Sequence, residues 1–231
     1  MNRLLRVARS SVGAKYIMAL TGLGLMIFVI GHMSGNLLIY GGKDALNSYA
    51  HGLTEHPVLL WTARGGLLTI FLIHLLMAFR LTQEDQAARP IRYVHESTIQ
   101  ASWASRHMLL TGFVILGFVI YHLMHFTFGI AVDPSNFKSA LPQDPKQHAD
   151  VAGMVIAGFK QPVIAITYII CQMFLGLHLW HGGSSWLQHL GLNGRGYDKL
   201  VNNLGVVVAL VVVLGNCSIP LVILMGWTPG S

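Results

Sequence analysis

Histidine is the residue type that most clearly suggests chemistry in this sequence. The chain has 231 residues, of which 12 are histidines and two are cysteines. Several histidines lie within or at the ends of long apolar stretches: His32, His74, His122, His125, His178 and His181. Neutral imidazole is a common ligand of metals and haem iron. Ionisable side chains deep in apolar helices usually mark a cofactor, an ion path or a proton relay.

Two of these histidines end copies of the same short pattern. "MALTGLGLMIFVIGHM" runs from Met18 to Met33, and "MLLTGFVILGFVIYHL" runs from Met108 to Leu123. Each copy contains Leu-Thr-Gly and then a histidine 11 residues after the threonine. The repeat predicts that the two copies are equivalent walls of one haem site.

The composition indicates that these histidines belong to membrane helices. The sequence is 53% hydrophobic and only 10% charged, whereas charged residues make up about 25% of a typical soluble domain. Apolar stretches of bilayer-spanning length lie at about 16–40, 58–81, 107–130, 161–187 and 201–226. We therefore expect one all-α domain over residues 1–231, a transmembrane bundle of five helices. The first stretch is too long for a signal peptide, and no small-residue cleavage site follows it.

Lysine and arginine residues predict the orientation of this bundle. At one set of helix ends lie Arg3, Arg6, Arg9, Lys15, Arg80, Arg89, Arg92, Arg106, Arg195 and Lys199. The opposite ends have fewer: Lys43, Lys138, Lys146 and Lys160. The positive-inside rule then places the N-terminus in the cytoplasm and the C-terminus on the outer side. The net charge of +6 is thus a topology signal, and we expect no nucleic-acid partner.

Depth along the helices groups four histidines into two levels. Counted from the charged inner ends, His32 and His122 lie about 25 Å above the inner edge. His74 and His178 lie about 9 to 15 Å above it. Two imidazoles at each of two levels are the ligands that two b haems need, with both axial positions of each iron filled. Such a centre transfers electrons and leaves no vacancy for oxygen or substrate.

The residues alone leave two competing ligands open. His125 and His181 each follow a proposed ligand by three residues, so in an α-helix they share roughly its face. Glycines near the ligands could let a porphyrin lie against backbone, although small residues also serve helix packing. They are Gly24, Gly31, Gly35, Gly112, Gly117, Gly176, Gly182 and Gly183.

The whole pattern resembles the dihaem cytochrome b membrane anchor, of the b558 type, of succinate dehydrogenases and fumarate reductases, the complex II family. The resemblance rests on "ALTGLGLMIFVIGHMSGNL", "LNSYAHGLTEHPVLLWTARGG", "FLIHLLMAFRL", "LLTGFVILGFVIYHL" and "GLHLWHGGSSWLQHLG", which together cover most of the chain. It implies two b haems, electron transport to or from menaquinone or another quinone, and a multi-pass protein of the prokaryotic cytoplasmic membrane. Flavoprotein and iron-sulfur subunits would bind on the cytoplasmic side and carry the dicarboxylate chemistry of the tricarboxylic acid cycle, so no catalytic residue is expected in this chain.

The resemblance also favours particular ligands. His178 is followed by Gly182 and Gly191, as the fourth-helix ligand of such anchors is, and His181 lacks both offsets. Arg80 follows His74 at the sixth position, and Thr111-Gly112 match His122 to the third-helix ligand. In one respect the chain departs from the family. Some quinol:fumarate reductases have a glutamate that takes part in proton movement where this chain has Gly176, so we do not expect that proton route.

Further candidates concern the quinone and the haem carboxylates. Polar residues near the membrane faces could donate to quinone carbonyls: His51 and Glu55 at the outer face, and Arg80, Trp103, Ser105 and Arg106 at the inner face. Arg64 lies about 15 Å outward of His74 along the second helix. We expect it to pair with a propionate of the outer haem, or else to snorkel to the outer interface.

Two other classes of protein fit part of the pattern. The cytochrome b subunit of a membrane hydrogenase or formate dehydrogenase also holds haem through helical histidines. A proton carrier with a histidine relay would usually add buried carboxylates. The predicted spans contain no Asp or Glu, and the adjoining outer loop contains only Asp44 and Glu55.

Overall fold

The computed structural model describes residues 10–88, 103–130, 137, 149–192, 194 and 196–229, and these form helices with no β-strand among them. Several residues used to predict the orientation lie outside the described residues: Arg3, Arg6, Arg9, Arg89, Arg92, Lys138, Lys146 and Arg195. Five helices are long and apolar enough to cross a membrane. The spans are Ser11–Gly41, Pro57–Ala87, Met108–Thr127, Pro162–His189 and Asp198–Leu224. They contain, in order, α2 (Ser11–Asn36), α4 (Pro57–Ala87), α6 (Met108–His122), α8 (Pro162–His189) and α9 (Asp198–Leu224).

These helices confirm the five predicted spans, and their ends differ by several residues for local reasons. Helix α2 begins at Ser11 because the Ser10 side chain caps it, accepting a hydrogen bond from the Gly13 backbone N–H at 3.0 Å. Helix α4 continues to Ala87, past an ion pair between Arg80 Nε and Glu84 Oε1 at 2.8 Å. An Arg–Glu pair four residues apart supports the helical turn that contains it.

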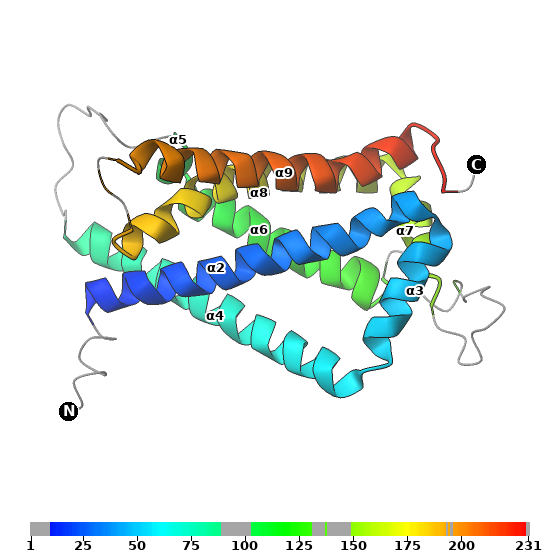
Figure 1. The fold of residues 1–231 in the computed structure, drawn as a ribbon, viewed down its shortest axis with the longest axis horizontal. Coiled ribbons are helices and arrows are strands. Elements are labelled where there is room, and N and C mark those ends of the chain that lie inside the picture. The colour runs from blue at the N-terminus through cyan, green and yellow to red at the C-terminus, as the bar shows by residue number, and fades with distance from the viewer. Residues whose placement is uncertain are drawn as a thin grey trace.

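Four of the five helices are neighbours in a ring, and α9 packs on the outside of it, mainly against α8. In Figure 1, α2 packs beside α4 near one end of the molecule, and the two helices diverge toward the other end. Helix α8 packs on both α2 and α6, and the rings of Phe79 and Phe113 link α4 to α6 with centroids 5.7 Å apart. We call the end where α2 begins the inner end and the end where it finishes the outer end.

Helix α9 packs closely against α8 at glycine residues. A Cβ atom added to Gly183 would lie only 3.0 Å from Gly205 Cα. Close approach of backbones through small residues is the usual way in which membrane helices associate. Gly176 also packs closely on α9, against Val213, so both glycines serve helix packing.

Shorter helices cover the outer end of the bundle. They are η1, a 3-10 helix (Leu37–Gly41), α3 (Lys43–Thr54) and α7 (Val151–Phe159). Buried Asn47 joins two of them: its Nδ2 donates to Asp150 Oδ1 at 2.8 Å, and its Oδ1 accepts from the Ala152 N–H at 2.9 Å. Asp150 also caps α7 by accepting from the Gly153 N–H. This outer layer was not predicted from the sequence.

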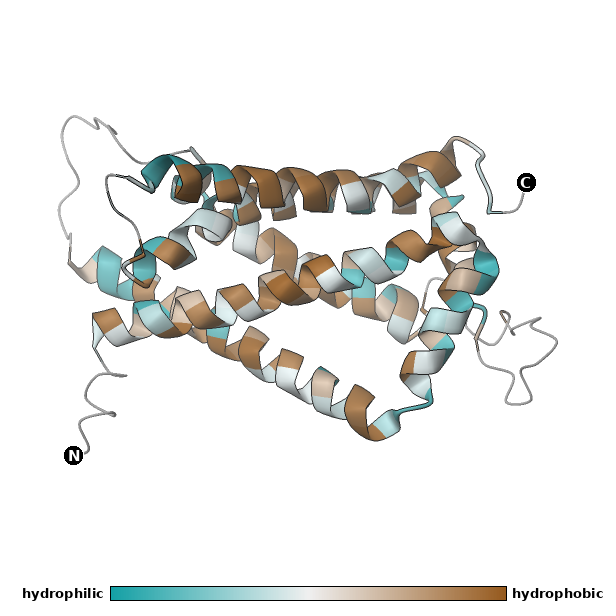
Figure 2. Cartoon of the chain, viewed as in Figure 1, coloured by the Kyte–Doolittle hydropathy of each residue, from teal (hydrophilic) through white to brown (hydrophobic). Residues whose placement is uncertain are grey.

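The surface of the long helices matches a lipid environment. Figure 2 shows hydrophobic residues along the middle of these helices and hydrophilic residues gathered toward their ends. Helix α4 buries none of its residues inside the structure. Its apolar outer half includes Val58, Leu59 and Trp61, which are at least two-thirds exposed. Such an apolar exterior is suited to a lipid bilayer.

Candidate functional site

The outer level of the predicted site brings His32 of α2 and His122 of α6 together. Their ring centroids lie 5.7 Å apart, and the ring planes are nearly perpendicular at 86°. Since a metal–imidazole bond is about 2 Å long, two rings that share one metal have centroids about 6 Å apart. Phe28 stacks on His32 at 5.5 Å, and Phe118 packs beside His122 at 5.8 Å. The two rings are therefore close to the spacing that two ligands of one metal need, and aromatic rings pack beside both.

The inner level contains His74 of α4 and His178 of α8, and each is held by a threonine of a neighbouring helix. Thr21 Oγ1 lies 3.1 Å from His74 Nδ1, and Thr111 Oγ1 lies 3.1 Å from His178 Nδ1. His178 is close enough to His74 to interact with it electrostatically. The role of these four histidines as haem ligands at two depths stays a prediction.

The two Leu-Thr-Gly copies contribute to both levels. Thr21 and Thr111 contact the inner histidines, whereas the histidines that end the copies form the outer pair. The offset of 11 residues between the threonine and the histidine corresponds to about 16 Å of helix. Each copy therefore contacts one histidine of the inner level through its threonine and supplies one histidine of the outer pair.

His125 points away from the outer pair. It lies in η2 (Leu123–Thr127), a π-helical turn that continues α6, and it is fully buried. Its Nδ1 lies 2.9 Å from Tyr168 Oη, and a Cβ atom on Gly158 of α7 would lie 3.0 Å from its Nε2. The His125 Nε2 atom itself has no hydrogen-bond partner among the described residues. His125 therefore packs toward α7 and α8, which favours His122 as the ligand.

Tyr168 is a residue of this region that sequence reasoning missed. Its hydroxyl lies between two imidazoles, 2.9 Å from His125 Nδ1 and 3.4 Å from His122 Nδ1. Tyr168 is only 4% exposed, and aromatic rings of Phe118 and Phe159 pack on it. No sequence signal marks it, because its role depends on α6 and α8 being neighbours.

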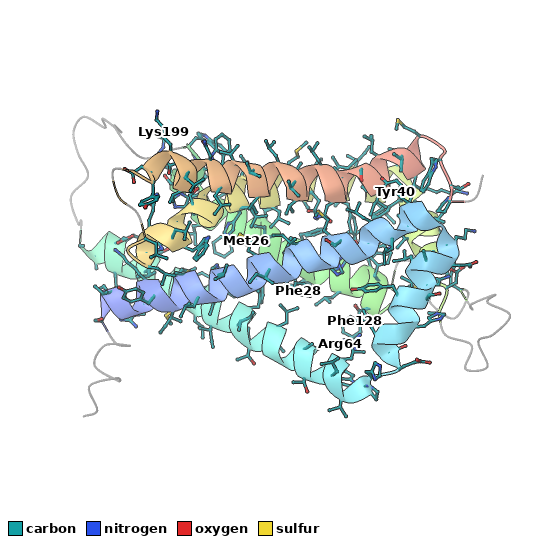
Figure 3. The ribbon with its side chains drawn as sticks, in the orientation of Figure 1. Met26, Phe28, Tyr40, Arg64, Phe128 and Lys199 are labelled. Atoms are coloured by element: carbon teal, nitrogen blue, oxygen red, sulfur yellow. The ribbon has the colours of Figure 1, made fainter. Side chains whose placement is uncertain are left out.

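Arg64 lies on the outer half of α4, where that helix has separated from α2 (Figure 3). Its guanidinium carbon is 5.0 Å from the centre of the Trp61 ring, an arrangement typical of a cation–π contact. The side chain is exposed, and no described carboxylate forms an ion pair with it. The pairing of Arg64 with a haem propionate stays a prediction. The contact between Arg64 and Trp61 was not predicted from the sequence.

The quinone candidates fall into two separate groups. At the outer end, His51 Nε2 lies 3.3 Å from the Ala149 carbonyl oxygen, and Glu55 borders a shallow hollow at the junction of α3 and α4. His56, Pro57, Val58, Leu59 and Thr62 complete the lining of this hollow.

The inner group is spread over two helices. Arg80 of α4 is paired with Glu84. Trp103, Ser105 and Arg106 lie together on the short helix α5 (Trp103–Arg106). The Trp103 ring stacks on His107 with centroids 4.1 Å apart. The structure therefore does not bring the six candidates into one pocket.

The residues of both levels fit haem as a cofactor. Two imidazoles at each level match the donor set of a b haem with two axial histidines. Gly182 lies one turn after His178 on the same helix face, and a Cβ atom there would meet nothing within 4 Å. By contrast, Gly24 and Gly35 pack against Ile70 and Tyr49. Among the described residues, no group of three or more His, Cys, Asp or Glu side chains could hold a bare metal ion.

Comparison with known proteins adds no relative. No protein-family model matches the chain, and neither do curated proteins or solved structures.

Proposed function

We propose that this chain is the dihaem cytochrome b membrane anchor of a succinate:quinone oxidoreductase or quinol:fumarate reductase. The observation that carries the proposal is the ring pair of His32 and His122 together with two further histidines, His74 and His178, each held by a threonine of a neighbouring helix. His32 and His122 would hold the outer b haem, and His74 and His178 the inner one. The helix without a candidate ligand, α9, packs outside the ring of four helices.

When bound, a b haem supplies reversible one-electron transfer. His32 and His122 would hold one haem and His74 and His178 the other, so that two imidazoles per haem would leave no iron site open to oxygen or substrates. Phe28 and Phe118 pack beside the two rings of the outer pair. The two levels lie about 16 Å apart along α2 and α6, so they divide the bilayer thickness between them.

The charged helix ends support the proposed partners and orientation. Lys15, Arg80, Arg106 and Lys199 lie at the inner end of the long helices. With this end in the cytoplasm of a prokaryotic cell, it faces the flavoprotein and iron-sulfur subunits that carry the dicarboxylate chemistry. The quinone, which is menaquinone or a related molecule, would bind near one of the two groups of polar candidates.

Purification of the tagged chain from its native membrane tests this function. We expect a flavoprotein with covalently bound flavin and an iron-sulfur protein to purify with it, and the complex to couple succinate and fumarate to a quinone. A His74→Ala variant should lose that coupling, whereas His189→Ala, in the last turn of α8, is the matched control. Purification with a hydrogenase or a formate dehydrogenase instead would overturn the assignment.

A further inference from the structure

We infer that Thr21 and Thr111 are positioning residues that fix the tautomer of His74 and His178 and thereby set the redox potential of the inner haem. The inference rests on the proposed function, because it assigns a role toward the haem that these histidines would hold.

Each threonine hydroxyl has a carbonyl partner for its single hydrogen. Thr21 Oγ1 lies 2.8 Å from the Ile17 carbonyl oxygen, and Thr111 Oγ1 lies 3.0 Å from the Met108 carbonyl oxygen. A carbonyl oxygen can only accept, so each hydroxyl donates to its own helix. The hydroxyl oxygen is then left to accept a hydrogen bond from the histidine, and Nδ1 is the ring nitrogen that faces it.

Thr21 has a second acceptor for its hydrogen on the same helix, because the Met18 carbonyl oxygen lies 3.1 Å from Thr21 Oγ1. A neutral imidazole with its hydrogen on Nδ1 keeps the lone pair on Nε2, which is then the atom available to iron.

The glycine after each threonine completes the arrangement. A Cβ atom on Gly22 would lie 3.2 Å from His74 Cε1, and one on Gly112 would lie 3.8 Å from His178 Cε1. The glycines therefore let each imidazole approach the helix backbone next to the hydroxyl. Thr21 and Thr111 are 8% and 0% exposed, so little solvent competes for these hydrogen bonds. A Thr-Gly pair on α2 thus contacts the imidazole of His74, and a second Thr-Gly pair on α6 contacts the imidazole of His178.

Other threonines in the long helices lack this second partner. Thr69 of α4 donates to the Gly65 carbonyl oxygen at 2.8 Å, and Thr167 of α8 donates to the Val163 carbonyl oxygen at 2.7 Å. Neither hydroxyl contacts an imidazole among the described residues. These two positions have the same hydroxyl-to-backbone bond without the histidine, so they are matched controls.

The expected effect follows from ligand basicity. A hydrogen bond from the distal ring nitrogen of a ligating histidine raises the basicity of the ligand, and a more basic ligand stabilises oxidised iron. Thr21→Val and Thr111→Val keep the side-chain shape and remove the hydroxyl. Each should therefore raise the midpoint potential of one and the same b haem, and leave the other unchanged.

The test is a potentiometric titration of purified complexes, with the haem content measured alongside. Thr21→Ser and Thr111→Ser should restore the wild-type potential, and Thr69→Val and Thr167→Val should leave both potentials as they are. Loss of one haem in a valine variant, with retention in its serine counterpart, also supports the inference. Where a valine variant does not accumulate in the membrane, alanine removes the hydroxyl without crowding the ring and should give the same shift.

Two results would overturn the inference while the proposed function stands. One is a wild-type complex with two b haems whose potentials are the same in all valine and alanine variants. The other is a shift of different haems by Thr21→Val and Thr111→Val, because both hydroxyls contact the inner level. A wild-type complex without b haem would instead overturn the proposed function itself.

Discussion

His122 and His125 lie three residues apart, and the structure gives them different surroundings. His122 faces His32, whereas His125 is buried against Tyr168 and Gly158. We predict that His122→Ala loses one b haem and that His125→Ala keeps both. The buried His125 ring fills space between helices, so its removal should lower stability by about 2 to 5 kcal/mol, as large-to-small core changes do.

Reduced-minus-oxidised spectra and thermal unfolding of the two variants check this prediction. His107→Ala, which removes an imidazole near the inner end that stacks on Trp103, is a suitable control. Loss of a haem in His125→Ala, with both haems kept in His122→Ala, would reverse the ligand assignment.

Arg64 has two candidate roles that substitutions can separate. It contacts the Trp61 ring, and its charge is predicted to pair with a propionate of the outer haem. We predict that Arg64→Leu lowers the potential of the outer haem, because a positive charge near the haem favours the reduced iron, and that Arg64→Lys lowers it less.

Trp61→Ala distinguishes the two roles of Arg64. It removes the cation–π partner and keeps the guanidinium, so both haem potentials should stay near their wild-type values. Equal potentials in Arg64→Leu and in the wild-type complex would show that Arg64 acts only through Trp61 or at the lipid interface.

At the scale of helices, the sequence predicts the long spans because length and apolar composition suffice for them. Length and composition do not predict α3 and α7. These helices depend on a hydrogen bond between Asn47 in α3 and Asp150 at the start of α7, and the two residues are far apart in the sequence. The sequence left His122 and His125 as competing ligands, because residues three apart share roughly one face of an α-helix. The chain turns π-helical directly after His122, and only His122 then lies beside His32, although both imidazoles reach the Tyr168 hydroxyl.

The same limit applies to the candidate site. The histidines could be found from the sequence because imidazoles are rare in apolar helices. Their hydroxyl partners could not, because Thr21 contacts a histidine on α4 and Thr111 one on α8. Which helices are neighbours is a property of the fold that the repeat alone does not contain.

The contact between α8 and α9 gives a prediction at this scale. A Cβ atom on Gly205 would collide with the Trp180 carbonyl oxygen and with Ser184. Relief of this collision would require the backbones of α8 and α9 to move apart. We expect Gly205→Ala to lower the free energy of unfolding by about 1 to 3 kcal/mol, as overpacking does. Thermal unfolding in detergent measures it.

Gly215→Ala is the matched control on the same helix. The added methyl group there meets the Met33 side chain, whose flexible end can move aside. It should therefore destabilise less than Gly205→Ala. Equal effects of the two substitutions would contradict the close backbone packing at Gly205.

For the molecule as a whole, the orientation in the membrane is open to a direct test. With Cys171 and Cys217 replaced by alanine, single cysteines can be placed at Lys43, at the outer end, and at Lys199, at the inner end. Figure 3 shows Lys199 at one end of the bundle and Tyr40, near Lys43 in the sequence, at the other.

The positive-inside rule predicts the labelling of these two cysteines. A membrane-impermeant maleimide should label Lys43→Cys in intact spheroplasts and Lys199→Cys only after permeabilisation. The opposite pattern would place the inner end outside the cell, and the proposed cytoplasmic partners would then have no surface to bind.

The haem content and spin state of the purified protein test the central claim most directly. Two imidazole pairs in one ring of helices predict two b haems per chain, both low-spin with two axial histidines. A pyridine haemochrome assay with electron paramagnetic resonance of the oxidised protein measures both properties. Two low-spin b haems in the wild-type chain, and one in each of His32→Ala and His178→Ala, are the predicted result. A chain without haem, or with a high-spin haem that has an open axial position, would contradict it.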